Sequence, residues 1–141
     1  MKLKKHSKIL IGIVVAVLLL TGITAGYLQS YYHTDTQAVS AYQYKQNSDT
    51  KIQTKMLSDG SIVCEPENPA AGFIFYPGGK VETSAYEPLM QACAAQDILC
   101  VLVSMPFHLA VFDKNAADGI QEQNPQIDSW YIGGHSLGGA M

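Results

Sequence analysis

Residues 130–139 read WYIGGHSLGG, and this stretch decides the fold. A short apolar run ends in glycine, and Ser136 follows between Gly134 and Gly138 in the pattern G-x-S-x-G. This spacing fits a sharp turn between a strand and a helix, which lifts the serine hydroxyl clear of a sheet. A phosphate-binding loop is excluded, because Gly139 and Ala140 stand where Lys and Ser or Thr are required. A dinucleotide fingerprint is excluded as well, since no G-x-G-x-x-G spacing can be drawn here. An ordinary glycine-rich turn is the alternative.

Two more continuous apolar runs lie upstream of this stretch. Residues 72–76 end at Pro77, and residues 98–103 are followed closely by Pro106. Strands that are apolar throughout, rather than at every second residue, are covered on both faces. The three runs therefore predict a parallel sheet flanked by helices.

The segments between the runs predict the remaining elements. Residues 84–96 carry apolar side chains at helical spacing, and residues 114–123 predict a weaker helix. Before the first run, Asp59-Gly60 between two short apolar segments predicts a two-residue type I′ hairpin. A hairpin followed by strand, helix, strand, helix and strand indicates an α/β fold.

Residues 9–26 form an uncharged run of 18 residues. As a helix it would be about 27 Å long, close to the hydrocarbon thickness of a bilayer. Four of the nine basic residues precede the run, namely Lys2, Lys4, Lys5 and Lys8. By the positive-inside rule this places the N-terminus in the cytoplasm. We therefore expect a single-pass protein of the cell membrane, held in the lipid bilayer from Ile9 to Tyr27, with its globular part outside. The alternative is a cleaved signal peptide and a secreted product.

The charge and cysteine content exclude several other classes of protein. Beyond the apolar run, five Lys face twelve Asp and Glu, and the chain has no Arg. This balance argues against nucleic-acid binding, which requires basic patches. The three cysteines, Cys64, Cys93 and Cys100, form no C-x-x-C pair and cannot close a disulfide framework. Each lies in an apolar segment and is expected to be a small buried side chain. No metal or organic cofactor is implied.

From about residue 54 onward the chain resembles the α/β-hydrolase superfamily, and in particular the membrane-anchored members similar to α/β-hydrolase fold 5. The motifs that carry the resemblance are YPGGKV at residues 76–81 and GHSLGG at residues 134–139. The resemblance implies that Ser136 is the catalytic nucleophile. It also implies that the backbone N–H of Leu137 is one oxyanion donor, and that the loop containing Gly79 and Lys80 supplies the other.

The chain departs from the superfamily pattern in one respect. In the superfamily, an acid and a histidine base follow the nucleophile. Here all four histidines, His6, His33, His108 and His135, come at or before the serine turn. We expect His135 to point away from Ser136. His108 follows a predicted strand, on the face where α/β proteins bind ligands, and we expect it to be a solvated loop residue; the alternative is that it lines a site. These observations predict the N-terminal half of a longer hydrolase, or a truncated reading frame that is inactive as it stands.

The expected organisation is a basic tail at residues 1–8, a transmembrane helix at 9–27, a polar stalk at 28–53 and an incomplete α/β-hydrolase domain at 54–141. The expected activity is that of an extracytoplasmic esterase- or lipase-like serine hydrolase, acting on a small ester or other acyl substrate. The alternative is a non-catalytic, membrane-tethered interaction module with a degenerate hydrolase fold.

Overall fold

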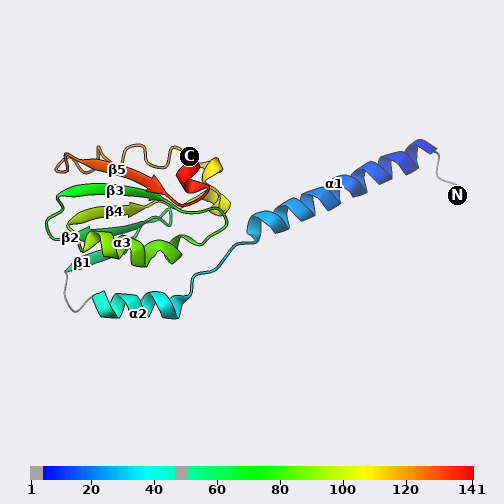
Figure 1. Cartoon of the computed structure of the whole chain (residues 1–141). Helices are drawn as coiled ribbons and strands as arrows, with labels where there is room; N and C mark the ends of the chain where they lie inside the picture. The colour runs from blue at the N-terminus through cyan, green and yellow to red at the C-terminus, as the bar shows by residue number, and fades with distance from the viewer. Residues whose placement is uncertain (1–4, 47–50) are drawn as a thin grey trace. The chain divides into compact units, whose positions relative to one another are not determined.

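The computed structural model describes residues 5–46 and 51–141 (Figure 1). Residues 1–4 of the predicted basic tail and residues 47–50 of the predicted stalk lie outside the described residues. The chain divides into two compact units, Met1–Ser30 and Tyr31–Met141.

The first unit is the helix α1, Lys5–Gln29. Every side chain from residue 9 to residue 26 is exposed, although most are apolar. The Thr21 and Thr24 hydroxyls donate to the carbonyl oxygens of Val17 and Leu20, each at 2.8 Å, so these two polar groups are satisfied within the helix. Within the described residues, His6–Gln29 is long and apolar enough to cross a membrane, and a signal sequence near an N-terminus has the same properties.

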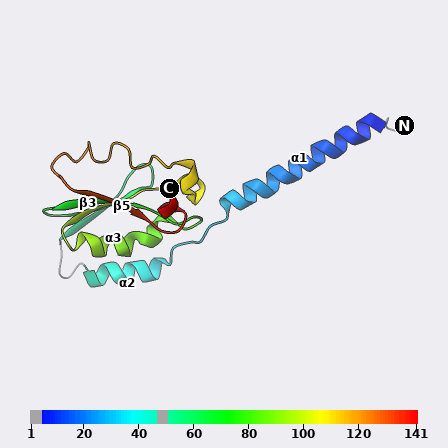
Figure 2. The ribbon, with the colours of Figure 1, turned by 45° about the horizontal axis from the view of Figure 1, so that its top comes forward.

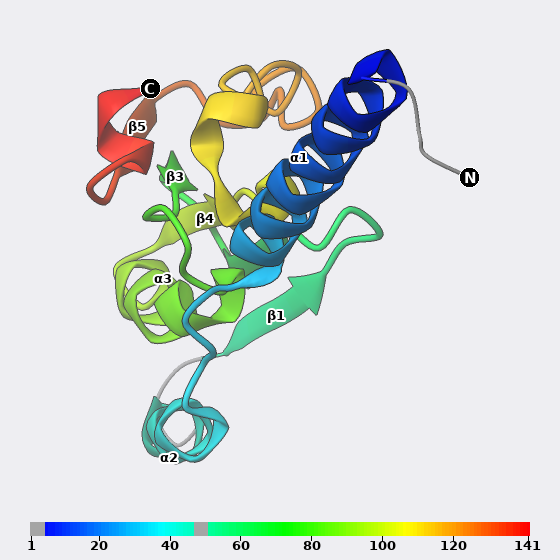
Figure 3. The ribbon, with the colours of Figure 1, turned by 90° about the vertical axis from the view of Figure 1, so that its right-hand side faces the viewer.

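The second unit is built on a mixed five-stranded sheet with the order β1-β2-β4-β3-β5. The first two strands form an antiparallel hairpin, and β2 pairs antiparallel with β4. The central strand β3 is parallel to both β4 and β5. Figure 3 shows β1 and β5 at opposite edges of this sheet. The strands are β1 (Ile52–Met56), β2 (Ile62–Pro66), β3 (Ala71–Tyr76), β4 (Ile98–Leu102) and β5 (Trp130–Gly134).

The strands β3, β4 and β5 lie within two residues of the predicted apolar runs, and the α/β sheet is confirmed. The first hairpin strand, β1, begins three residues earlier than predicted. The hairpin is also confirmed, but its turn is longer than predicted. The register pairs Met56 with Ile62, so five residues separate the strands. Gly60 has φ +87°, whereas Asp59 is not left-handed, and a type I′ turn requires positive φ at both central residues. The Ser61 N–H donates instead to Asp59 Oδ1 at 2.9 Å, which stabilises the wider turn.

One face of the sheet is covered by α3, Glu87–Ala94, which follows a 3₁₀ turn, Thr83–Tyr86 (Figure 1). Pro88 stands in its first turn, where a missing N–H costs nothing. Met90 and Ala94 face the sheet and are almost completely buried against Leu102 and its neighbours. A further helix, α2 (Thr36–Gln46), lies against α3. Residues 31–46, which the sequence assigned to the stalk, thus belong to the same compact unit as the sheet.

The opposite face is covered by an irregular segment, residues 103–129 (Figure 2). The helix predicted over residues 114–123 is wrong, because this part consists of successive turns. Gly119 has φ +79°, which no α-helical residue adopts. The segment is fastened to β3 by Tyr76, whose hydroxyl donates to the Lys114 carbonyl and accepts the Ala117 N–H, both at 2.9 Å.

Candidate active site

Ser136 lies on a tight turn directly after β5. Its φ is +50°, a left-handed conformation that is uncommon for any residue with a side chain. The Gly138 N–H donates to the His135 carbonyl at 2.9 Å and the Gly139 N–H to the Ser136 carbonyl at 3.1 Å, so a 3₁₀ turn, Gly138–Ala140, begins immediately. The Ser136 side chain is exposed. A strained serine between a strand and a helical turn is the geometry of a nucleophile elbow.

The glycines of the motif are required by close backbone contacts. A Cβ on Gly138 would lie 2.4 Å from the carbonyl oxygens of both Tyr76 and Pro77. A Cβ on Gly134 would lie 2.6 Å from the backbone of Gly138. Backbone atoms at these distances cannot move aside without a large energy cost. The turn therefore requires glycine at residue 138, where it contacts the end of β3, and at residue 134, where it contacts its own backbone.

The loop after β3 lies beside this turn, and we call residues 78–82 the oxyanion loop, after the role that the resemblance implies for it. The sheet register pairs Tyr76 with Gly134, which brings the two loops to the same end of adjacent strands. A Cβ on Gly79 would lie 3.0 Å from the Leu137 side chain. The N–H groups of Gly79 and Leu137 donate to no acceptor within the described residues. The arrangement therefore leaves two unused donors on facing loops.

The other N–H groups of the oxyanion loop are engaged. The Lys80 N–H donates to the His108 carbonyl at 2.6 Å. The Gly78 N–H donates to the Tyr86 hydroxyl at 3.0 Å. Of the two loop residues that the sequence offered as donors, Gly79 is thus available for a substrate oxygen, and Lys80 already has an internal acceptor.

Tyr86 links the two loops, a contact that no sequence pattern indicated. Its hydroxyl lies 2.8 Å from His135 Nδ1, in addition to accepting the Gly78 N–H. Its ring packs against Phe75 with the ring centroids 5.3 Å apart. A Cβ on Gly78 would lie 2.7 Å from the Tyr86 oxygen, so glycine is needed there for the hydroxyl to reach the loop. The sequence placed Tyr86 only among the apolar side chains at helical spacing in residues 84–96. Its contacts could not be predicted, because its partners are distant in sequence.

No base is hydrogen-bonded to Ser136 within the described residues. No hydrogen bond to its side chain is formed in this part of the chain. His135 bonds to Tyr86 as described above. His108 stacks on Tyr31 with the ring centroids 3.9 Å apart, and its Nδ1 is buried without a hydrogen-bond partner. His108 is therefore half-buried, and the prediction that it is a solvated loop residue is wrong. Burial, with help from the charge of Lys80, lowers the pKa of His108 below its ordinary value.

The cysteines contribute no nucleophile. Cys64 and Cys100 are fully buried, as predicted, and Cys93 is half-buried. Burial raises the pKa of Cys64 to about 11 and raises the pKa of Cys100 further, so both remain thiols at neutral pH. Within the described residues, no three His, Cys, Asp or Glu side chains gather in a way that could hold a metal ion.

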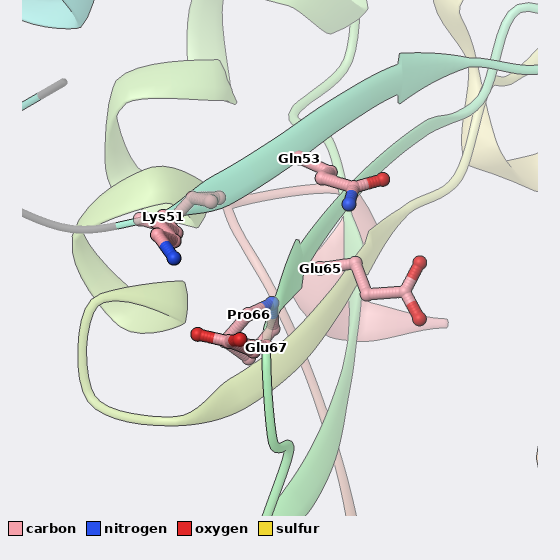
Figure 4. Close-up of a pocket in the computed structure, with 6 residues that line it drawn as sticks. Lys51, Gln53, Glu65, Pro66 and Glu67 are labelled. Carbon is pink, nitrogen blue, oxygen red and sulfur yellow. The ribbon is translucent and has the colours of Figure 1, made fainter.

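One hollow in the second unit is remote from Ser136. It has a volume of about 470 Å³ and lies at the open end of the β1–β2 hairpin, lined by Lys51, Gln53, Glu65 and Glu67 among others (Figure 4). The carboxylates of Glu65 and Glu67 point away from each other in Figure 4. Because its polar groups do not converge, the hollow has no arrangement suited to acid–base chemistry. A smaller hollow of about 200 Å³ lies behind the elbow, between Tyr76, Ile132 and Gly138.

Comparison with known proteins agrees with this geometry. Residues 72–141 match the model of a family described as the alpha/beta hydrolase family. The C-terminal part of this chain belongs to the alpha/beta hydrolase family. No curated protein and no solved structure matches the chain.

Proposed function

We propose that this protein is a serine hydrolase that acts on an ester-like or other acyl substrate, with Ser136 as its nucleophile. The observation that carries the proposal is the left-handed φ of Ser136 on a turn that follows β5. This strain is maintained by the close passage of Gly134 and Gly138, and strain of this kind collects at functional sites.

The chemistry follows from the two facing loops. Ser136 Oγ attacks the acyl carbon, the carbonyl π bond opens, and the negative charge moves to the carbonyl oxygen. The free N–H groups of Leu137 and Gly79 stabilise that oxygen by hydrogen bonds. Preorganised donors of this kind are worth roughly 10²–10³ in rate each. The Ser136 proton passes to the solvent, because no base is hydrogen-bonded to Ser136 within the described residues.

The first helix supports a membrane setting for this activity. Residues 9–26 expose apolar side chains along the whole helix, and a lipid environment would cover them. The Lys residues before the apolar run favour a cytoplasmic N-terminus, so the hydrolase unit would face outward. A cleaved signal sequence would send the same unit outward without the anchor.

Labelling with a fluorophosphonate tests the nucleophile. In this reaction Ser136 Oγ bonds to phosphorus, fluoride leaves, and the serine proton passes to the solvent. Serine hydrolases that lack triad members keep a residual rate advantage of about 10³–10⁴ from the oxyanion donors and binding. We therefore expect the full chain in detergent micelles to be modified slowly but selectively at Ser136, as read by mass spectrometry of its peptides.

Ser136→Ala should abolish this labelling. Ser129, which is also exposed, serves as the internal reference for unselective reaction. Equal modification of Ser129 and Ser136, or no modification after prolonged exposure, would contradict the proposal. Either result would favour a non-catalytic interaction module.

A further inference from the structure

The segment just after the first unit pairs with the oxyanion loop. We call residues 31–34 the docking segment. The Tyr32 N–H donates to the Lys80 carbonyl at 2.7 Å, and the Glu82 N–H donates to the Tyr32 carbonyl at 2.9 Å. These two bonds form an isolated parallel bridge between Tyr32 and Val81. The docking segment therefore pairs with the loop through its backbone, as a short strand would.

Side chains strengthen this pairing on one side. The Thr34 N–H donates to Glu82 Oε2 at 2.7 Å, and the Thr34 and Ser84 hydroxyls lie 2.7 Å apart. His33 Nδ1 lies 3.8 Å from the same Glu82 oxygen. A half-buried carboxylate thus accepts from the docking segment at the point where the oxyanion loop ends.

A stacked ring strengthens it on the other side. Tyr31 covers the His108 ring at 3.9 Å, and the His108 carbonyl accepts the Lys80 N–H at 2.6 Å. Phe107 and His108 have φ values of 54° and 56°, an uncommon conformation for two successive residues with side chains. Such a turn persists only where its surroundings hold it, and Tyr31 is part of those surroundings.

These contacts fix the peptides on both sides of the Gly79 N–H. The preceding N–H, on Gly78, is held by Tyr86, and the following one, on Lys80, is held by His108. The carbonyl of Lys80 is held by Tyr32. Of the N–H groups of residues 78–82, that of Gly79 donates to no acceptor within the described residues, which leaves it available to a substrate oxygen.

We propose that the docking segment positions the oxyanion hole, so that the stretch joining the apolar helix to the sheet is a working part of the active site. The inference rests on the proposed hydrolase function, because it assigns a role in stabilising the oxyanion. Residues 31–34 touch no reacting atom and act through Lys80, Glu82 and His108. Cleavage of a signal sequence near Gly26 would leave the segment in place, whereas a cut within it would release the loop.

Two substitutions in the full chain, in detergent micelles, test the inference. Glu82→Ala removes the acceptor of the Thr34 N–H, and Tyr31→Ala removes the cover of His108. For each variant, the limiting rate of Ser136 labelling by a fluorophosphonate is separated from the apparent binding constant of the probe. We expect the limiting rate to fall about tenfold and the binding constant to stay unchanged. This loss is smaller than the roughly 10²-fold loss that follows complete removal of one oxyanion donor, because the Gly79 N–H is displaced and not removed.

Hydrogen exchange supplies a second readout that does not depend on reactivity. Protection of the Lys80 and Glu82 amides should fall in both variants, while that of β3 and β4 should stay as in the unaltered chain. Tyr31→Phe keeps the ring and should restore the labelling rate. Glu67→Ala removes an exposed carboxylate remote from the loop and is the control. It should change neither the labelling rate of Ser136 nor the protection of the Lys80 and Glu82 amides.

Each outcome decides between the two proposals. Reduced loop protection with an unchanged labelling rate would show that docking does not position the donor, and the inference would fall while the hydrolase function stood. Unchanged protection in both variants would show that the segment does not hold the loop, with the same consequence. If the unaltered chain shows no selective labelling of Ser136, the hydrolase function fails, and the inference fails with it. If the amides of β3 and β4 lose protection in Glu82→Ala, that variant has destabilised the whole sheet. The Tyr31→Ala variant then decides whether the docking segment positions the loop.

Discussion

Gly138→Ala is the sharpest perturbation of the serine turn. The new Cβ would lie 2.4 Å from the carbonyl oxygens of both Tyr76 and Pro77, whereas ordinary contact begins at 3.4 Å. The turn and the end of β3 must therefore separate by about 1 Å, which weakens the 3.1 Å bond from the His135 N–H to the Tyr76 carbonyl. Overpacking of this kind costs typically about 1–3 kcal/mol, and two obstructing backbone atoms place the cost in the upper half of that range.

The assay is pulse proteolysis of the full chain in detergent micelles across a urea series. With a denaturant slope of about 1–3 kcal/mol per molar, a loss of about 2 kcal/mol lowers the urea midpoint by roughly 1 M. Gly22→Ala is the matched control, since a Cβ there meets nothing within 4 Å. If the two variants gave the same midpoint, the close backbone passage at Gly138 would be refuted.

Four further outcomes are expected. Tyr86→Phe leaves the buried Gly78 N–H without its acceptor, at a cost of about 1–3 kcal/mol, and should speed exchange of that amide; unchanged exchange would contradict the bond. Because the pKa of His108 is lowered in the folded chain, mainly by burial, the stability it contributes is present above its ordinary value of 6.5 and is lost as the pH falls below it. The protection factor of the Lys80 amide should accordingly drop between about pH 7 and pH 5, and a flat profile would refute this coupling. Residues 1–141 should hydrolyse p-nitrophenyl acetate no faster than the Ser136→Ala variant, because loss of triad members costs about 10⁴–10⁶ in rate; turnover that depends on Ser136 would reveal a local base. A reporter fused to the C-terminus should be cut by protease added to intact cells, and protection of the reporter would reverse the proposed orientation.

The strands could be predicted from the sequence because burial on both faces leaves a clear signal. Phe75, Val101 and Leu102 lie in continuous apolar runs, and each is buried in the sheet. The segment between β4 and β5 gave no such signal. Ala117 and Ile120 do pack against the sheet, but the intervening Gly119 has a positive φ and prevents a helix.

The tight turn at Ser136 could be predicted because its geometry is local. A serine between two glycines specifies a tight turn without reference to distant residues, whereas the partners of the turn depend on the fold. Tyr86 is 49 residues from His135 in the chain. The pairing of Tyr32 with Lys80 uses backbone groups, which every residue except proline carries, so no side-chain pattern could announce it.

The register between β3 and β5 has a consequence for how the site tolerates change. The loop with the free donor leaves β3 after Tyr76, and the serine turn leaves β5 after Gly134, its partner across the ladder. The position of each loop along the sheet is thus set by the number of residues in its strand, with a rise of about 3.3 Å per residue. A substitution on the outer edge of β5, where Tyr131 and Ile132 are 63% and 66% exposed, leaves that spacing untouched. A single-residue deletion inside either strand would shift one loop by a full step and invert the faces of the strand, so length is constrained here more tightly than composition.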